Sequence, residues 1–206
     1  MASLAVNSNS GGDGNVYNDN AGTWATVKGL TTGTAAGGTD PVNVYASMLS
    51  SRSIGRIFLP FDTSALTSAA VISAATVQFN VTSIASSNGT LHAVQTTQAD
   101  PTSLAAGDFD NIAGSSSTMT SGGSVAVSST GIKTITLDAT GLTWISKTGY
   151  TLLALVEDRD LTNTDPNPND YRFAVNTNET ATSGNRPLLT ITYTLPGGAS
   201  FLLNLV

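Results

Sequence analysis

The chain has 206 residues, of which 11% are charged, and 8 basic and 14 acidic side chains give a formal net charge of −6 at pH 7. The absence of cysteine excludes a disulfide scaffold, thiol catalysis and cysteine-ligated zinc, and a single histidine excludes a centre built from several histidines. The acidic balance argues against a nucleic-acid surface, which needs clustered lysine and arginine to bind phosphates.

Short segments that alternate apolar and polar residues recur along the chain, separated by clusters of Gly, Ser, Asn and Asp. This pattern is typical of an all-β protein. Residues 151–156 are apolar on both faces, so this strand is expected in the middle of a sheet, covered on both sides. The expected strands, in chain order, are 15–17, 23–27, 55–61, 76–81, 90–95, 133–137, 151–156, 171–175 and 189–193.

Short helices are expected at 102–104 and 139–147, where a possible N-cap or the spacing of Leu142 and Ile145 favours them. Polar runs are interpreted as loops, and the Ser, Thr and Gly content predicts a flexible segment at 114–124. These loop predictions cover 7–20, 29–43, 111–124 and 161–170. Eight or more short antiparallel strands predict a single-domain jelly-roll β-sandwich of two antiparallel sheets, spanning residues 1–195.

Two stretches resemble a known domain family. Residues 56–66 read Arg-Ile-Phe-Leu-Pro-Phe-Asp-Thr-Ser-Ala-Leu, an Arg-led strand that ends in Phe-Asp before a Ser/Leu turn. Residues 185–193 begin with Asn-Arg-Pro and continue as an alternating strand that ends in Tyr. Both resemble the jelly-roll domains of the DNRLRE type, which are similar to carbohydrate-binding modules. The resemblance spans about residues 13–194, although the tryptophan-rich middle segment of that family is missing here.

Three further stretches, at 94–98, 106–110 and 139–150, look like parts of virion proteins of tailed phages. This resemblance implies a non-enzymatic virion subunit: a capsid decoration, fibre or tail-associated protein that assembles in the host cytoplasm. Its partners would be further copies of itself, other virion proteins and a cell-surface glycan. The alternative is a carbohydrate-binding module of a secreted bacterial protein, although the first six residues do not have the features of a signal peptide.

Tyr17 and Tyr45 are the candidate ligand-binding residues. Aromatic faces bind the apolar faces of sugar rings by dispersion, and these two tyrosines are expected to be better exposed than Trp144, which is assigned to the core.

The acidic segment 157–170 is the candidate metal site, with Asp158, Asp160 and Asp165 as ligands. Calcium takes six to eight oxygens from carboxylates and carbonyls, which such a loop offers. The spacing does not match an EF-hand, so a solvated loop with Asx-turns is the alternative. Asp13 and Asp19 flank a second loop whose spacing indicates a turn, with a metal ion as the less favoured interpretation. No other cofactor is expected.

No catalytic centre is predicted. His92 has no Ser or Asp motif near it in the sequence, which leaves a triad without support. Only two glutamates are present, Glu157 and Glu179, and nothing marks them as an acid–base pair. Arg56 is expected to have a structural role, pairing with a carboxylate such as Asp62.

The chain ends in an apolar segment, 196–206, that follows the break at Pro196. Burying this segment at roughly 25 cal/mol per Å² of apolar area would stabilise a contact by several kcal/mol before entropy is counted. We expect Phe201, Leu202, Leu203, Leu205 and Val206 to contact a neighbouring subunit or a sheet edge. Packing on the same domain is the alternative. No stretch approaches the ~20 apolar residues of a membrane helix.

Overall fold

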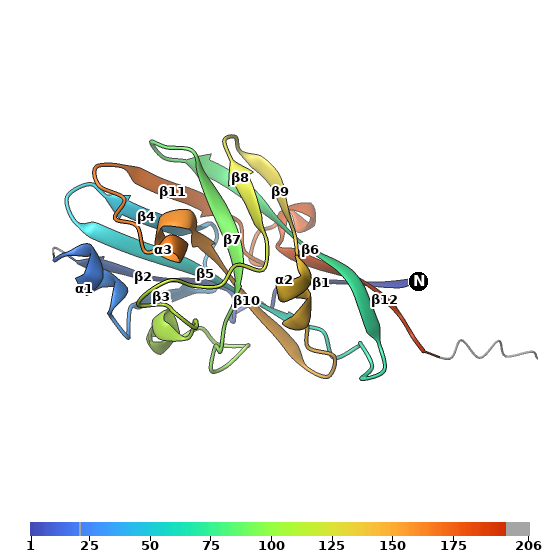
Figure 1. Cartoon of the computed structure of the whole chain (residues 1–206). Helices are drawn as coiled ribbons and strands as arrows, with labels where there is room; N and C mark the ends of the chain where they lie inside the picture. Colours follow the sequence, from blue (N-terminus) through green and yellow to red (C-terminus); the bar gives the residue numbers. More distant parts are fainter. Residues whose placement is uncertain (21, 197–206) are drawn as a thin grey trace, which may run out of the picture.

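The described part of the chain, residues 1–20 and 22–196 of a computed structural model, consists mainly of antiparallel strands (Figure 1). The strands are β1 Ala2–Asn7, β2 Gly14–Asn20, β3 Thr34–Gly37, β4 Val42–Met48, β5 Arg52–Asp62, β6 Val71–Ile84, β7 Gly89–Gln95, β8 Ser124–Val127, β9 Gly131–Thr136, β10 Tyr150–Glu157, β11 Asp170–Val175 and β12 Leu188–Thr194. The helices are α1 Trp24–Lys28, η1 Ala106–Asp110, α2 Ala139–Thr143, α3 Asp158–Thr162 and η2 Ser183–Asn185. None of the helices in these residues is long and apolar enough to cross a membrane.

Two long strands shape the sheet by changing partners along their length. The hydrogen-bonded order is β1-β12-β6-β11-β4-β5-β10-β7-β8, with β2 on β5, β3 on β2 and β9 on β6. β5 pairs first with β4 and then with β10, while β6 pairs first with β12 and then with β11. The sheet therefore folds over on itself. The predicted all-β class, a single-domain sandwich of the jelly-roll kind, is confirmed.

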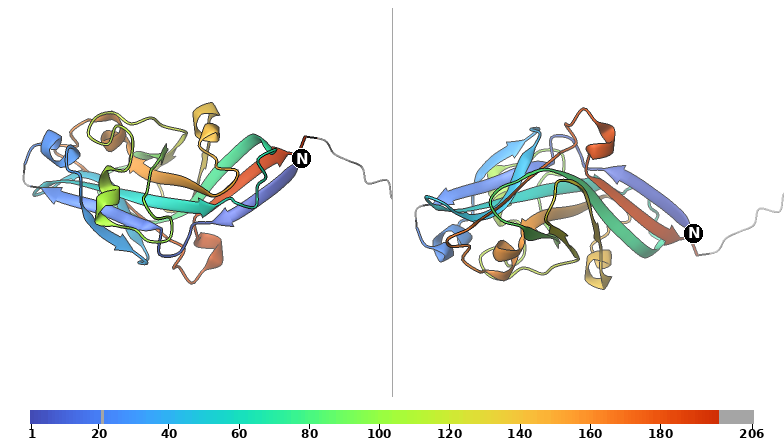
Figure 2. Two further views of the ribbon diagram at one scale, coloured as in Figure 1. Left: turned by 90° about the horizontal axis from the view of Figure 1, so that it is seen from below. Right: turned by 90° about the horizontal axis from the view of Figure 1, so that it is seen from above.

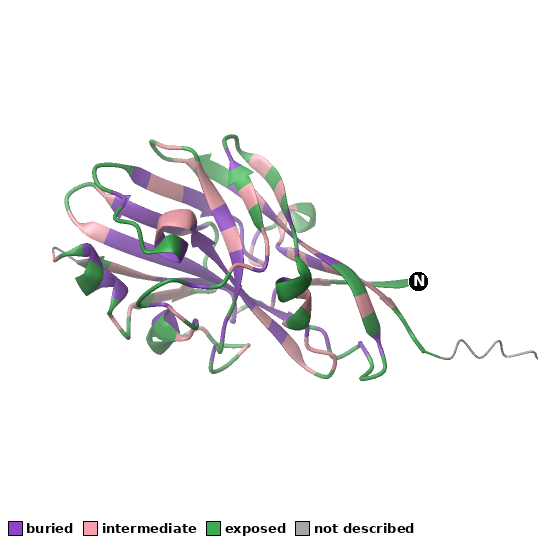
Figure 3. Ribbon diagram, viewed as in Figure 1, coloured by how far each residue is buried: buried purple, intermediate pink, exposed green. Residues whose placement is uncertain are grey.

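The strands β4, β5 and β10 are largely buried (Figure 3). The buried apolar residues form two clusters, one on each face of the β5–β10–β7 layer. The first lies between the layers of the sandwich and contains Phe61, Phe79 and Phe173. The second lies under α1, η1 and α3 and contains Phe58, Phe109 and Leu161. β10 is therefore covered on both faces, as its continuous apolar sequence predicts.

The segment between η1 and β8 is part of this cover, which corrects the expectation of a flexible loop at 114–124. Met119 is buried with Ile112 in the second cluster, and the backbone of Met119 donates to the carbonyl of Leu161. Two apolar side chains, Ile112 and Met119, are enough to anchor this polar segment, because both are buried in the second cluster.

Local structure differs from the sequence expectations in further places, and the strands β1, β4 and β8 were not expected at all. Residues 24–28 form α1 instead of a strand, because Thr23 caps the segment by accepting a hydrogen bond from the Thr26 amide. The helix expected at 102–104 occurs a few residues later, as η1, and α2 is shorter than expected. β3 forms within the predicted loop 29–43 by pairing with β2.

The two ends of the described chain lie side by side, because β1 pairs with β12 and Ala2 stands opposite Tyr193. They lie at one end of an elongated molecule, and the β4–β5 turn lies at the other (Figures 1 and 2). The predicted partner-binding residues Phe201, Leu202, Leu203, Leu205 and Val206 lie outside the described residues.

Candidate functional site

The site begins with a row of four residues in register across four strands. Tyr17 of β2 stands opposite Gly55 of β5, Gly55 opposite Tyr45 of β4, and Tyr45 opposite Arg172 of β11. Residues that are directly opposite in neighbouring strands point to the same face. Pairing of these strands therefore brings together the two tyrosines that the sequence proposed separately.

Gly55 is the residue that makes room for the Tyr45 ring. A Cβ atom at position 55 would lie 2.4 Å from Cε1 of Tyr45 and 2.6 Å from Cδ1. The guanidinium of Arg172 lies over the ring, 3.9 Å from its centroid. Tyr45 is thus held between a glycine and an arginine, with 3% of its surface exposed. The expectation that Tyr45 is well exposed is wrong, because its neighbour in β5 lacks a side chain and the ring fills the space.

Tyr17 and Tyr45 both line a polar cleft of about 360 Å³, which we call the tyrosine cleft. Tyr17 is half-buried and Asp19 is exposed, whereas Tyr45 belongs to the buried floor. Burial raises the pKa of the Tyr45 hydroxyl, with Asp19 acting in the same direction, so the hydroxyl stays protonated. The complete lining is Asn15, Tyr17, Asp19, Ala36, Thr39, Pro41, Val42, Asn43, Tyr45 and Arg172.

A second hollow of about 190 Å³ lies beside the cleft, and Asp19 and Arg172 line both. The second hollow is lined mainly by serine side chains of β4, β5 and the turn between them. Together, the two hollows offer a carboxylate acceptor, a guanidinium donor, hydroxyls and one half-buried aromatic ring. This set can hydrogen-bond a chain of hydroxyl groups and contact the apolar face of a ring.

The three predicted metal ligands have separate basic partners. Asp158 contacts His92, Asp165 pairs with Arg52, and the carboxylate of Asp160 pairs with two cations. Within residues 1–20 and 22–196, no three acidic or histidine side chains come together as a metal-ion cluster. The structure does not bring Asp158, Asp160 and Asp165 to a common point, and a calcium ion shared by them stays a prediction.

Asp160 is at the centre of a buried charge cluster that sequence reasoning missed. Its carboxylate accepts two hydrogen bonds from Arg56, at 2.8 and 2.9 Å, and one from Lys28 at 2.9 Å, and all three side chains are fully buried. Arg56 also donates to the carbonyls of Phe109 and Ser115. Burial alone would raise the pKa of Asp160, but Arg56 and Lys28 hold it below its ordinary value. The carboxylate partner of Arg56 is therefore Asp160 and not Asp62, which is exposed.

His92 has two polar partners. Its Nδ1 lies 3.0 Å from the Ser121 hydroxyl, and its Nε2 lies 3.1 Å from the Asp158 carboxylate. The amides that follow Ser121 are already engaged: Gly122 donates to Ala93, and Gly123 donates to the Ser121 hydroxyl. These amides cannot also stabilise an oxyanion, as a serine nucleophile requires. The contacts of His92 with Ser121 and Asp158 therefore connect the turn before β8 to α3.

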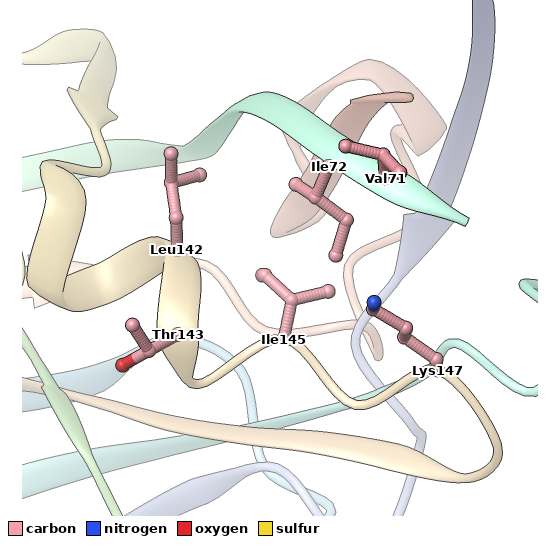
Figure 4. A pocket seen from close by; sticks show the side chains of 6 residues that line it. All are labelled: Val71, Ile72, Leu142, Thr143, Ile145 and Lys147. Carbon is pink, nitrogen blue, oxygen red and sulfur yellow. The ribbon is translucent and has the colours of Figure 1, made fainter. Parts of the chain in front are cut away.

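A third cavity, of about 410 Å³, is lined by both apolar and polar side chains (Figure 4). Figure 4 shows the side chains of Ile72, Leu142 and Ile145 around a common space, with Lys147 at its edge. Val71 also lines it and is 54% exposed. Val71 stands opposite Thr194 in the β6–β12 pair, so the end of β12 lies beside this cavity.

No family model matches the chain, and no curated protein matches it significantly.

Proposed function

We propose that the protein is a non-enzymatic structural subunit of a tailed-phage virion, and that the tyrosine cleft binds a glycan. The observation that carries the glycan part is that Tyr17, Tyr45, Asp19 and Arg172 line one polar cleft. The virion part rests on the resemblance of three sequence stretches to phage proteins. The similarity to DNRLRE-type jelly-roll domains supports both a sandwich scaffold and sugar binding.

The arrangement of the molecule suits a subunit that is attached by its ends. The described termini lie together at one end, and the β4–β5 turn, which lines the second hollow, lies at the other. Attachment through the terminal end would direct both hollows away from the particle. Many copies on one particle would turn weak single contacts into firm adhesion, because a second contact forms at a high effective concentration.

A glycan array followed by titration calorimetry tests the binding site. We expect Tyr17→Ala to weaken binding of the selected glycan by roughly tenfold, because the sugar ring loses its aromatic contact. Asp19→Asn removes a charged acceptor and is expected to act in the same direction. Tyr150→Ala is the control, since Tyr150 is half-buried but does not line the cleft. If no glycan on the array binds, or if Tyr150→Ala loses as much affinity as Tyr17→Ala, the assignment of the cleft is contradicted.

A chain shortened at Gly197 tests the role of the apolar tail. We propose that Phe201, Leu202, Leu203, Leu205 and Val206 contact a second subunit, and the cavity beside the end of β12 has apolar side chains, Ile72, Leu142 and Ile145, that such a contact can use. We expect the shortened chain to form a smaller oligomer than the full chain, as measured by light scattering, and to lose its binding to purified particles. Unchanged mass together with unchanged particle binding would rule out this role, and absence of the protein from the particles would rule out the virion proposal.

A further inference from the structure

Two carboxyl groups meet between the β1–β2 loop and the segment that follows β11. Asp13 of the loop is fully buried, and Glu179 is partly buried. The side chains of Asp13 and Glu179 are hydrogen-bonded to each other. Oδ1 of Asp13 and Oε2 of Glu179 are buried and have no other hydrogen-bond partner among the described residues. Because an ionised carboxylate can only accept hydrogen bonds, this contact requires a proton on one of the two groups.

The second oxygen of each carboxyl group is held by the opposite segment. Oδ2 of Asp13 accepts from the Ser8 hydroxyl at 2.6 Å and from the Asn178 backbone amide at 2.8 Å. Oε1 of Glu179 accepts from the Ser10 hydroxyl at 2.8 Å. The two carboxyl groups therefore join the β1–β2 loop to the segment after β11, both through these donors and through their contact with each other.

The proton of this contact belongs to Asp13. Burial raises the pKa of Asp13 to about 7, and the charge of Glu179 adds to the rise. Partial burial alone would raise the pKa of Glu179 as well, but hydrogen bonds from Ser10, Thr177 and Asp13 hold it below its ordinary value. Below pH 7, Asp13 is thus an acid that donates to the Glu179 carboxylate.

The pair has no basic partner among residues 1–20 and 22–196, since the ion pairs of these residues involve neither Asp13 nor Glu179. Titratable residues from the surrounding elements hydrogen-bond to neighbours of the pair. They are Asp40 before β4, Asp100 after β7, Tyr150 at the start of β10 and Arg186 before β12. The charge that acts on Asp13 is that of Glu179. Loss of the proton therefore leaves two negative charges facing each other in a buried contact.

We propose that Asp13 and Glu179 form a pH-sensitive contact that fastens the β1–β2 loop to the segment after β11. In the protonated form, a hydrogen bond joins the two carboxyl groups. When the proton leaves, the two carboxylates repel each other away from water, and the loop separates from the segment. The loop continues into β2, which carries Tyr17, and the segment follows β11, which carries Arg172, so each is continuous with a strand of the tyrosine cleft. The contact itself does not depend on the proposed function.

Thermal unfolding of the full chain at a series of pH values tests the contact. The folded chain keeps the Asp13 proton up to a pH near 7, whereas an unfolded aspartate loses it near its ordinary pKa of 3.8, so stability falls as the pH rises between these values. We expect the unfolding temperature to fall by roughly 5–10 °C from pH 5 to pH 8. An NMR titration of the carboxyl carbons should give a midpoint near pH 7 for Asp13. Both measurements are independent of glycan binding.

Asp13→Asn separates this contact from the other groups that titrate near neutral pH. An asparagine amide donates to Glu179 at every pH, so this variant is expected to lose most of the fall in unfolding temperature and to be more stable than the unaltered chain at pH 8. Glu179→Gln should also reduce the fall, and it remains available if Asp13→Asn does not fold. Glu157→Gln is the matched control, because Glu157 is fully buried and burial also raises its pKa to about 7. This control should keep the Asp13 midpoint.

Two results would overturn the proposal. The first is an Asp13 carboxyl carbon that titrates below pH 5, which would mean that both carboxylates are ionised in the folded chain. The second is an Asp13→Asn variant that keeps the full fall in unfolding temperature between pH 5 and pH 8, which would place the titrating group elsewhere.

Discussion

Asp160→Ala is expected to lower the free energy of unfolding by about 3–5 kcal/mol, the range for breaking a buried ion pair by removing one partner. The variant leaves Arg56 and Lys28 buried without their carboxylate, and neither cation can reach water without opening the layer above β5. The unfolding temperature should fall by roughly 6–20 °C for a chain of this size. Urea denaturation followed by circular dichroism measures the effect.

The control for this experiment is Asp158→Asn, two residues away. Asp158 is 37% exposed and contacts His92, so its loss should change stability by less than about 1 kcal/mol. Replacing Lys28, Arg56 and Asp160 together by apolar residues should cost much less than Asp160→Ala alone, since no charge is then left unpaired. A loss below 1 kcal/mol in Asp160→Ala would show that water or a rearranged partner compensates the two cations.

The charge cluster also explains why the cover layer is ordered. Lys28 ends α1, Asp160 belongs to α3, and Arg56 reaches the carbonyls of Phe109 and Ser115 from β5. One arginine therefore connects η1 and the polar segment after it to the sheet. Hydrogen exchange in 106–117 should accelerate in Asp160→Ala before exchange in β10 does, because the cover depends on this cluster more directly than the strands do.

Sequence patterns predicted the parts of this fold that depend on local alternation. The continuous apolar run at 151–156 indicated a strand covered on both faces, and β10 confirms this. The Arg-led stretch indicated a structural arginine, but its carboxylate partner lies 104 residues away at Asp160. Periodicity reports which face a residue occupies, and it contains no information about which distant residue will stand opposite.

The same limit applies to the candidate sites. Tyr17 and Tyr45 could be named as aromatic residues in polar surroundings, yet their meeting depends on the register of β2 and β4 against Gly55. Asp160 could be named as an acidic residue in an acidic segment, but its burial depends on two cations from other elements. Asp13, Gln98 and Asn178 come from three separate segments, and only the packed chain shows that hydrogen bonds bring them around one loop.

Gly55→Ala is expected to destabilise the fold by about 1–3 kcal/mol, the range for overpacking a buried site. The added methyl group would lie 2.4 Å from the Tyr45 ring, and Arg172 closes the opposite face of that ring, so the ring cannot move aside freely. Displacing the ring also alters the floor of the tyrosine cleft. We therefore expect glycan affinity to fall together with stability, measured by urea denaturation and calorimetry.

The control is Gly184→Ala, because a Cβ atom at that position meets nothing within 4 Å. A double-mutant cycle with Tyr45→Ala identifies the cause: once the ring is removed, Gly55→Ala should cost less than about 0.5 kcal/mol, since the methyl group then enters empty space. Equal costs of Gly55→Ala in the two backgrounds would place the strain elsewhere in β5. A stable Gly55→Ala variant with full glycan affinity would show that the ring position does not control the cleft.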